Sequence, residues 1–583
     1  PDISLDTWMG YDGSTGDPVR TWLRRLNLQP NEVDNYMAGR SQNWYDDVFR
    51  SGFRQDHNLS VSGRNKDVAY YLGAGYLDNE GIIVGDRFKT LRTRANIEAN
   101  ITSYLTAGVN MQATSRNESA IAHDWSQIVN LSPWGTKYDE SGNLVWRPNY
   151  EASGGVNPGY DAFHTDRKQR VNALNATVFG KLKLPFGITF QTNFTPQLQL
   201  YERYNHEKSS HESWATFGGR ASRQQQETYY WQVDNILKWD KEFGLHRFDV
   251  TLLANAEKFQ RWDNTMTNDN FDPDDSRGYH GIDGGVNPRI TSDDQYSTGD
   301  ALMARLVYSL KNRYIFTGTF RRDGYSAFGQ RNPRANFGSM ALAWVFTDEP
   351  FFSSDWFNYG KLRFSWGSNG NRDIGRYVAL SDLTTGKYLY VLPDGTVIQM
   401  SQLWVNRMQN ANLRWERNTS YNLGLDFALF NSRLDGSLEF YQMNSTDLLV
   451  LRSLPNVTGF DNVMDNLGEV RNRGFEVTLN SLNISREKFS WRTTALFQLN
   501  RNAIQHIYHT YGPDGRELDD IQNRWFIGRA IDVIWDWRAL HVYQLGQEEE
   551  AARYGLRPGD YKLEDVNDDG RFNNDDRQFL GFT

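Results

Sequence analysis

The chain has no cysteine among its 583 residues and no apolar run that approaches the length of a membrane-spanning helix. The first absence excludes a disulfide scaffold, a thiolate metal site and a cysteine nucleophile. The second excludes helical spans, which need about 20 apolar residues, and it agrees with a mean hydropathy of −0.69. Basic residues are also few, because 63 Lys and Arg stand against 72 Asp and Glu. No concentrated basic stripe offsets this excess, so we expect no nucleic-acid partner.

Alternation of apolar and polar side chains is the strongest pattern that is present. It runs from Thr90 to Thr114 through two stretches joined by Thr102-Ser103. Successive side chains of a strand point to opposite faces, so each stretch predicts a strand with one apolar and one polar face. The apolar face holds Leu91, Ala95, Ile97, Ala99 and Ile101. The polar residues, which we expect to line a lumen, are Arg92, Arg94, Asn96, Glu98, Asn110 and Gln112.

The same alternation recurs along the chain and predicts an all-β protein of about seventeen strands. The strands are expected to begin near Ile3, Asn58, Val68, Thr90, Tyr104, Val171, Ile188, Glu227, Arg247, Ala301, Tyr314, Phe337, Lys361, Tyr421, Leu434, Phe475 and Trp491. A water-soluble β-sandwich also alternates. Here, however, short and long connections alternate along the chain. The short periplasmic turns and long extracellular loops of an outer-membrane barrel alternate in the same way. The pattern therefore favours a transmembrane antiparallel β-barrel.

The expected strand count is odd, whereas bacterial barrels close with an even number. By this count the last expected strand runs outward and leads into a long external segment from Asn502 to Thr583. We therefore expect the barrel to be incomplete within the chain.

Six segments, in order along the chain, resemble the SusC/RagA family of TonB-dependent outer-membrane transporters. The first and the last are the most specific to that family. The segments are 43–83, 313–329, 361–371, 413–427, 466–480 and 558–581. The resemblance implies that residues 1–583 are one incomplete barrel domain. It also implies that the N-terminal signal, the carboxypeptidase-like domain, the TonB box and the plug are absent from these residues. The complete barrel of such a transporter has about 22 strands, so the last strands are implied to be absent as well.

The resemblance further implies an importer in the bacterial outer membrane, in contact with its lipid. Such a protein takes up oligosaccharides or oligopeptides with a SusD-like surface lipoprotein, and TonB with ExbB and ExbD drives it by the proton-motive force. The alternatives are a surface scaffold or receptor of the same family, a siderophore-type receptor, or, if the barrel prediction fails, a soluble β-rich carbohydrate-active enzyme. The residues themselves do not indicate an enzyme. His506 and His509 lack a third metal ligand at a defined spacing, and the sequence has no nucleophile elbow or phosphate loop.

Aromatic residues in the long connections are candidates for binding a glycan or peptide ligand. Flat rings with amides and carboxylates beside them suit stacking and orienting hydrogen bonds. The candidates are Trp125, Trp134, Trp146 and Trp262. The alternative is that these rings belong to the interface girdle or to loop cores.

Residues 565–576, DVNDDGRFNNDD, resemble a calcium-binding loop. Oxygen ligands fall at positions one, three, five, seven and twelve, and Gly570 falls at the sharp turn in position six. The expected ligands of a structural Ca²⁺ are Asp565, Asn567, Asp569, the carbonyl of Arg571, and Asp576. Asp576 replaces the usual bidentate Glu. A solvated turn rich in Asp and Asn is the alternative.

Overall fold

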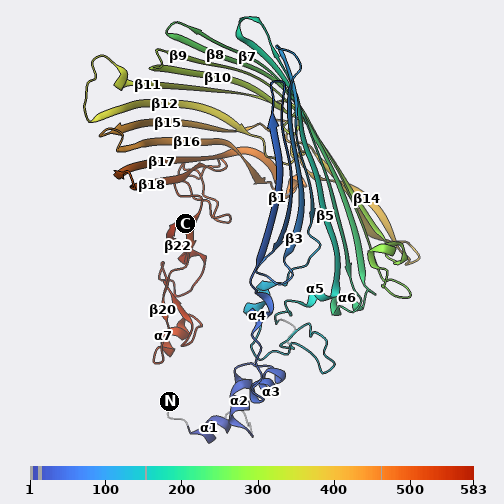
Figure 1. The fold of residues 1–583 in the computed structure, drawn as a ribbon. Helices are drawn as coiled ribbons and strands as arrows, with labels where there is room; N and C mark the ends of the chain where they lie inside the picture. The colour runs from blue at the N-terminus through green and yellow to red at the C-terminus, as the bar shows by residue number, and fades with distance from the viewer. Residues whose placement is uncertain (1–3, 11–15, 151–153, 461, 583) are drawn as a thin grey trace. The chain divides into compact units, whose positions relative to one another are not determined.

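The computed structural model describes residues 4–10, 16–150, 154–460 and 462–582. Strands dominate, and the helices are short (Figure 1). The longest α-helices described, α2 (Pro18–Arg25) and α3 (Pro30–Met37), have 8 residues each. In this part of the chain, no helix has both the length and the apolar character needed to cross a membrane.

Sixteen strands form one antiparallel sheet in which neighbours in the chain are neighbours in space, except that β15 follows β12. These strands are β1 (Phe53–Arg64), β2 (Val68–Glu80), β3 (Arg87–Asn100), β4 (Leu105–Asn117), β5 (Thr165–Lys183), β6 (Ile188–Glu207), β7 (Arg220–Phe243), β8 (His246–Asp269), β9 (Arg289–Leu310), β10 (Tyr314–Tyr325), β11 (Arg334–Val345), β12 (Phe357–Asn371), β15 (Glu416–Leu429), β16 (Leu434–Ser453), β17 (Asn462–Arg486) and β18 (Phe489–His506). The all-β prediction is confirmed, and each expected strand after the first has its counterpart.

The first expected strand, near Ile3, is wrong. Residues Leu5–Gly10 form helix α1 instead, while Ile3 and Tyr11 lie outside the described residues. Leu5, Trp8 and Met9 are spaced three and four residues apart, as on one face of a helix. The Ser4 hydroxyl accepts a hydrogen bond from the Thr7 N–H at 3.2 Å, which caps the first turn. Without this strand the count is even, so the odd count was a product of the wrong assignment.

Short and long connections alternate along most of the sheet, as expected, but the order fails at 326–333 and 346–356, where the connection expected to be long is the shorter of the two. Links of a few residues, such as 65–67, 244–245 and 311–313, alternate with long ones such as 118–164, 270–288 and 372–415. The tight turns use left-handed backbone: Lys311 and Asn312 have φ of 56° and 53°. A separate hairpin of β13 (Asp382–Val391) and β14 (Val397–Arg407) lies within the 372–415 connection.

Several strands are longer than the alternation indicated, and the loops between them are correspondingly shorter. The connection expected from Phe259 to Asp300 is in fact 270–288, because β8 continues to Asp269. Strands β7 and β8 have 24 residues each, whereas about 9–11 suffice to cross a bilayer. Each of these strands is therefore more than twice as long as a bilayer crossing requires.

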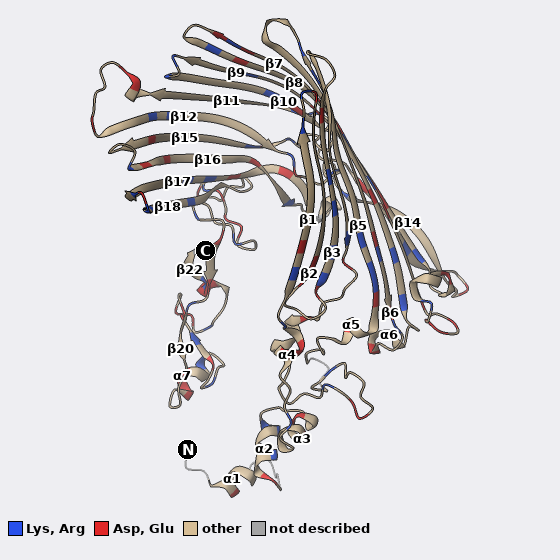
Figure 2. Ribbon diagram, viewed as in Figure 1, with Lys and Arg blue, Asp and Glu red and all other residues tan. Residues whose placement is uncertain are grey.

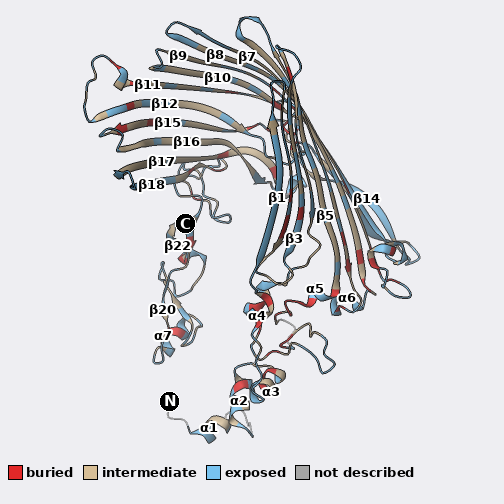
Figure 3. Cartoon of the chain, viewed as in Figure 1, coloured by how far each residue is buried: buried red, intermediate tan, exposed pale blue. Residues whose placement is uncertain are grey.

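The chain divides into two compact units, each described by itself. Unit 1 comprises Pro1–Lys183, Gln191–Asp234 and Glu257–Tyr296, and unit 2 comprises the remainder. In unit 1, Trp44 and Val48 of helix α4 (Trp44–Val48) pack on Ile128 and Leu131 of the connection after β4. In unit 2, Phe328, Phe337 and Trp415 form a second buried cluster. Buried residues are few along the strands themselves (Figure 3).

The segment after β18, expected to be one long external connection, contains small elements of its own. Strand β19 (Val533–Asp536) pairs with β22 (Gln578–Phe582), and β20 (Ala539–Val542) pairs with β21 (Tyr561–Leu563). The remaining short helices of the chain are α5 (Tyr160–His164), α6 (Glu212–Ala215), α7 (Glu548–Arg553), η1 (Trp125–Asn130), η2 (Pro185–Gly187), η3 (Gly278–Gly284), η4 (Phe346–Asp348), η5 (Asn456–Thr458) and η6 (Asn574–Asp576).

Candidate ligand site and the two faces of the sheet

The six residues predicted to face a lumen share one face of β3 and β4. Arg94 lies opposite Gln112 and Asn96 opposite Asn110 in the antiparallel register, and directly opposed residues point to the same side of a sheet. Arg92 and Glu98 follow at two-residue intervals on β3 and therefore join them. The register thus brings the set together, while its role in lining a lumen stays a prediction.

Charged groups on this face pair across strands. The Arg92 guanidinium donates from Nη2 to Asp56 Oδ1 at 2.5 Å and to Asn58 Oδ1 at 3.4 Å, both on β1. Arg94 lies 5.9 Å from the centre of the Tyr71 ring. Figure 2 shows Lys, Arg, Asp and Glu at intervals along these strands. Such a face is suited to contact with water and polar solutes.

The opposite face carries exposed apolar side chains. Leu91 is 54% exposed, Ile97 38% and Leu59 79%. Ile97 lies opposite Tyr70 on β2 and Val109 on β4, so the apolar rows continue from strand to strand. A contiguous apolar surface of this kind marks a face that another apolar phase covers.

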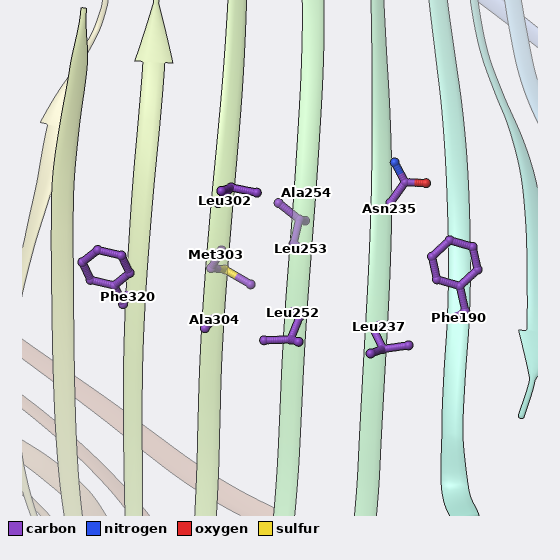
Figure 4. A pocket seen from close by; sticks show the side chains of 10 residues that line it. All are labelled: Phe190, Asn235, Leu237, Leu252, Leu253, Ala254, Leu302, Met303, Ala304 and Phe320. Atoms are coloured by element: carbon purple, nitrogen blue, oxygen red, sulfur yellow. The ribbon is translucent and has the colours of Figure 1, made fainter. Parts of the chain in front are cut away.

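Unit 2 has an apolar surface of the same character across strands β6 to β10. A shallow groove of about 440 Å³ is lined by Phe190, Leu237, Leu252, Leu302 and Phe320 among others. Their side chains lie on neighbouring strands, with Asn235 as the one polar residue labelled there (Figure 4). Leu302 and Phe320 are 58% and 55% exposed, so this groove is open rather than part of a closed core.

A polar cavity lies in unit 1, where the connection between β4 and β5 meets the connection between β6 and β7. Its volume is about 350 Å³. Two indole rings and several carboxylate, amide and imidazole groups line it together. The lining residues are Asp124, Gln127, Trp146, Val156, Asn157, Pro158, Asp161, Thr165, Glu207, His211, Ser213 and Trp214. Aromatic faces beside hydrogen-bonding groups suit a sugar or peptide ligand.

His211 ties the two connections together. Its Nδ1 accepts a hydrogen bond from the Ser213 N–H at 3.0 Å, and its Nε2 lies 2.9 Å from Asp161 Oδ1. A ring nitrogen that accepts carries no proton, so Nε2–H is the donor to Asp161. The Trp146 ring packs on His211 at 6.1 Å and is covered on its own face by Arg147 at 4.4 Å. The cavity wall is therefore oriented by contacts on both sides.

His164 lies behind this wall and is only 9% exposed. Its ring is 4.3 Å from that of Tyr160, and its Nδ1 lies 2.9 Å from the Ser210 hydroxyl. Burial lowers the pKa of His164, and the nearby His211 and Lys208 lower it further against the opposing effect of Asp161. The imidazole is therefore held neutral, as a packed polar side chain.

The four tryptophans expected to bind ligand have different surroundings. Trp146 lines the cavity. Trp125 is 55% exposed and begins η1, next to the lining residue Asp124. Trp134 packs edge-on against Tyr36 at 5.1 Å, in the manner of a loop core. Trp262 lies within β8, so its assignment to a loop is wrong for the reason given above: the strand continues past the apolar pattern.

Sequence reasoning missed Trp214, His211 and Asp161 as members of this group. Asp161 and His211 lie 50 residues apart in the chain, and the spacing between them has no period. The only local signal is the density of aromatic and hydrogen-bonding groups in HESWATF, residues 211–217.

The loop 565–576 has part of the geometry expected for calcium. Asp565 Oδ1 and Asn567 Oδ1 both accept from the Asp569 N–H, at 3.2 and 3.1 Å, so these three side chains converge on one turn. Gly570 has φ of 76°, as the sharp turn requires. Asp576, fully buried, accepts instead from the Val566 and Asn573 N–H groups at 3.0 and 2.9 Å. These hydrogen bonds hold the loop in a turn that Asp576 closes, and the binding of Ca²⁺ by Asp565, Asn567, Asp569 and the Arg571 carbonyl stays a prediction.

Comparison with known proteins places these features in context. A family model described as TonB dependent receptor-like, beta-barrel, matches residues 182–577. TonB-dependent receptor P3 of Formosa agariphila is 26% identical over 575 residues, which cover 94% of this chain and 56% of that protein. TonB-dependent receptor SusC of Bacteroides thetaiotaomicron is 26% identical over 553 residues, which cover 85% of this chain and 51% of that protein. The chain thus spans about half the length of these curated relatives, which are named as receptors rather than enzymes.

Among solved structures, the RagAB peptide transporter is similar with a TM-score of 0.77 at 17% identity. The match covers 99% of this chain and 65% of the RagAB chain. At this identity the likeness establishes the fold and confirms the β-barrel prediction. The family match and the similarity to SusC confirm the resemblance found in the sequence.

Proposed function

Since the chain belongs to the TonB-dependent receptor family, as part of a receptor β-barrel, we propose that it forms the wall of an outer-membrane importer. The cargo is an oligosaccharide or an oligopeptide. A SusD-like surface lipoprotein presents it, and TonB with ExbB and ExbD releases it inward at the expense of the proton-motive force. The observation that carries the proposal is the sheet with one polar and one exposed apolar face.

The two faces support the membrane part of the proposal. Leu59, Leu91 and Ile97 are exposed on the sheet and favour contact with lipid. Apolar side chains are less stable in water than in an apolar environment, so a water-soluble protein would tend to bury them. Arg92 and its partners on the other face favour a water-filled interior. A surface scaffold of the same family would have the same faces but would need neither energy nor a cargo.

The cavity of unit 1 supports the choice of cargo. Trp146 and Trp214 offer stacking surfaces, and Asp161, Asn157 and Gln127 offer hydrogen-bond acceptors and donors at the same cavity. A sugar ring or a peptide needs both kinds of contact. We propose that this cavity contacts the cargo before it enters the barrel.

Uptake by cells that carry the whole receptor tests the proposal. The probes are a fluorescent mixture of oligosaccharides and a fluorescent tryptic peptide digest, each with and without a protonophore. We expect one probe class to accumulate only while the proton-motive force is intact. Accumulation of neither class, or accumulation that the protonophore leaves unchanged, would show that the chain is not an energised importer.

A paired substitution tests the cavity. Trp146→Ala with Trp214→Ala should weaken binding of the accepted probe by about tenfold or more, since each ring stacks for about 0.5–1.5 kcal/mol beyond its burial. Trp356→Ala is the control, because that ring is exposed, lies outside the cavity lining and is not among the ligand-binding candidates. Equal binding by the double variant and the control would remove the cavity from the cargo path.

We also propose that loop 565–576 binds Ca²⁺ as a structural ion. Asp565, Asn567 and Asp569 would supply side-chain oxygens, and the Arg571 carbonyl a further one. Calcium calorimetry on the whole receptor compares Asp569→Asn with Asp568→Asn, which removes the same charge at a position outside the ligand set. We expect a loss of about tenfold or more in affinity for the first variant only. Identical isotherms for the two variants would reject the site.

A further inference from the structure

The end of β18 brings together two imidazoles and a buried carboxylate. Potential ligand atoms of His506, His509 and Glu517 all lie within 4.8 Å of one another. The two rings are 4.8 Å apart between centres, and His506 Nδ1 lies 2.7 Å from Glu517 Oε2. The sequence has no third ligand at a defined spacing from the two histidines, and it is the fold that brings Glu517 to them.

A tight turn returns Glu517 to the histidines. β18 ends at His506, and the chain then reverses at 512–515, where the Gly512 N–H donates to the Arg516 carbonyl at 2.8 Å. The Leu518 N–H donates to the Thr510 carbonyl at 2.8 Å, so the two arms of the turn lie side by side. His509 adopts the left-handed conformation with φ of 51°, which histidine tolerates better than most residues.

Backbone groups fix the carboxylate in place. Glu517 Oε1 accepts from the N–H groups of Ile507, Tyr508 and His509 at 2.8, 3.0 and 2.8 Å. The Glu517 side chain is 6% exposed, and among the described residues its ion pair is with His506. One carboxylate oxygen is thus saturated, and the other faces the imidazoles. A buried anion in this setting is stabilised by a cation between it and the rings.

We propose that His506, His509 and Glu517 bind a divalent transition-metal ion of the zinc type. Two imidazole nitrogens and one carboxylate oxygen are ligands that Zn²⁺ prefers, whereas Ca²⁺ and Mg²⁺ require mostly oxygen. The ion takes the place of the proton that His506 Nδ1 shares with Glu517 Oε2, and that proton is released to water. Three protein ligands leave a fourth position for water.

The consequence is a metal clip between a strand end and the turn that follows it. His506 belongs to β18, whereas His509 and Glu517 belong to the connection that leads to the small elements at 533–582. An ion held by all three joins that connection to the sheet. This site is separate from the candidate calcium loop in both position and ligand chemistry.

Calorimetry on the whole receptor, purified in detergent and stripped with EDTA, tests the site with ZnCl₂ as the probe. We expect one zinc equivalent to bind with release of a proton, and MgCl₂ not to compete. His506→Ala and His509→Ala should each weaken zinc binding by about tenfold or more. His541→Ala, in β20 and outside the cluster, is the matched control and should bind as the unsubstituted receptor does.

Cobalt provides a second readout that loss of structure cannot imitate. CoCl₂ at a site with imidazole and carboxylate ligands gives visible absorption bands, which should be lost in both histidine variants and kept in His541→Ala. Where an alanine variant loses its folded electrophoretic mobility, His506→Gln and His509→Gln replace it, since they retain bulk and polarity. Zinc isotherms and cobalt spectra that are the same in the cluster variants and in the control would overturn the proposal.

Discussion

On β3 and β4 the polar side chains form a row along one exposed face of the sheet. In the connections after β4 and β18, by contrast, individual polar side chains are buried, and each is fixed by its own hydrogen bonds. Arg92 and Asp56 on the strands are 34% and 28% exposed at the side chain. Glu517 and Asp576 in the connections are 6% and 0% exposed, and each accepts two or more backbone N–H groups.

This difference predicts two kinds of response to substitution. On the strands, the face decides: any polar residue suits one side and any apolar residue suits the other. In the connections, the individual contact decides, because an unpaired buried group costs free energy that no neighbour offsets. Four substitutions or conditions test this contrast.

The largest effect is expected at Ile97 on the apolar face of β3. Ile97→Arg should destabilise the folded receptor in lipid by about 2–4 kcal/mol, since a charge near the bilayer midplane must leave water. Asn96→Arg, one residue earlier and on the polar face, is the control and should fold normally. Urea unfolding in phospholipid vesicles measures both. Equal stability of the two variants would mean that the faces are wrongly assigned.

The next effect is expected at Asp576. Asp576→Ala removes the acceptor for the Val566 and Asn573 N–H groups. In the absence of calcium, it should lower the free energy needed to open this loop by about 2 kcal/mol. Amide hydrogen exchange at these two residues reports the opening directly. Asp575→Ala, an exposed carboxylate in the same short helix, is the control. Unchanged exchange in Asp576→Ala would show that the loop is held by other contacts.

The strand rows were predictable because alternation is a local signal. Each expected strand from Asn58 onward has a counterpart, and the faces of β3 and β4 agree with the register. The strand ends were not predictable. Residues 220–227 of β7, RASRQQQE, contain a single apolar side chain, yet the backbone ladder continues through them. Both faces of this part of the strand are polar, so backbone hydrogen bonding extends the strand without any alternation to reveal it.

The candidate sites divide in the same way. Loop 565–576 was noticeable in the sequence because its candidate oxygen ligands fall within twelve residues. Glu517 was missed although it lies 11 residues from His506, because that spacing matches no short ligand motif. Trp146 and His211 come together only through the tertiary fold, and no pattern within either segment connects them. Function that rests on side chains from separate connections needs the structure.

A smaller effect is expected from pH at His164. Its pKa is lowered in the folded protein, mainly by burial, so the unfolded connection binds more protons below about pH 6.5. Stability of this connection should therefore fall as the pH drops below that value, by at most about 1.4 kcal/mol per pH unit. Proteolysis at sites within 154–164, followed from pH 7.5 to pH 5, measures it. His164→Asn should flatten the profile, whereas the control His57→Asn, on exposed β1, should leave it unchanged; a steep profile in His164→Asn would assign the effect to another group.

The smallest effect is expected at Arg92. Arg92→Gln removes the ion pair with Asp56, but both side chains are partly exposed on a face that already holds Asn58 and other hydrogen-bonding groups. Water and these neighbours can satisfy Asp56, so the unfolding midpoint in vesicles should agree with that of the unsubstituted receptor within the scatter of repeats. Arg92→Leu isolates the role of the face, because it removes polarity as well as charge while the apolar side stays intact. A large loss of stability in Arg92→Gln would show that strand residues are fixed by individual contacts, as in the connections, and the contrast between the two regions would fail.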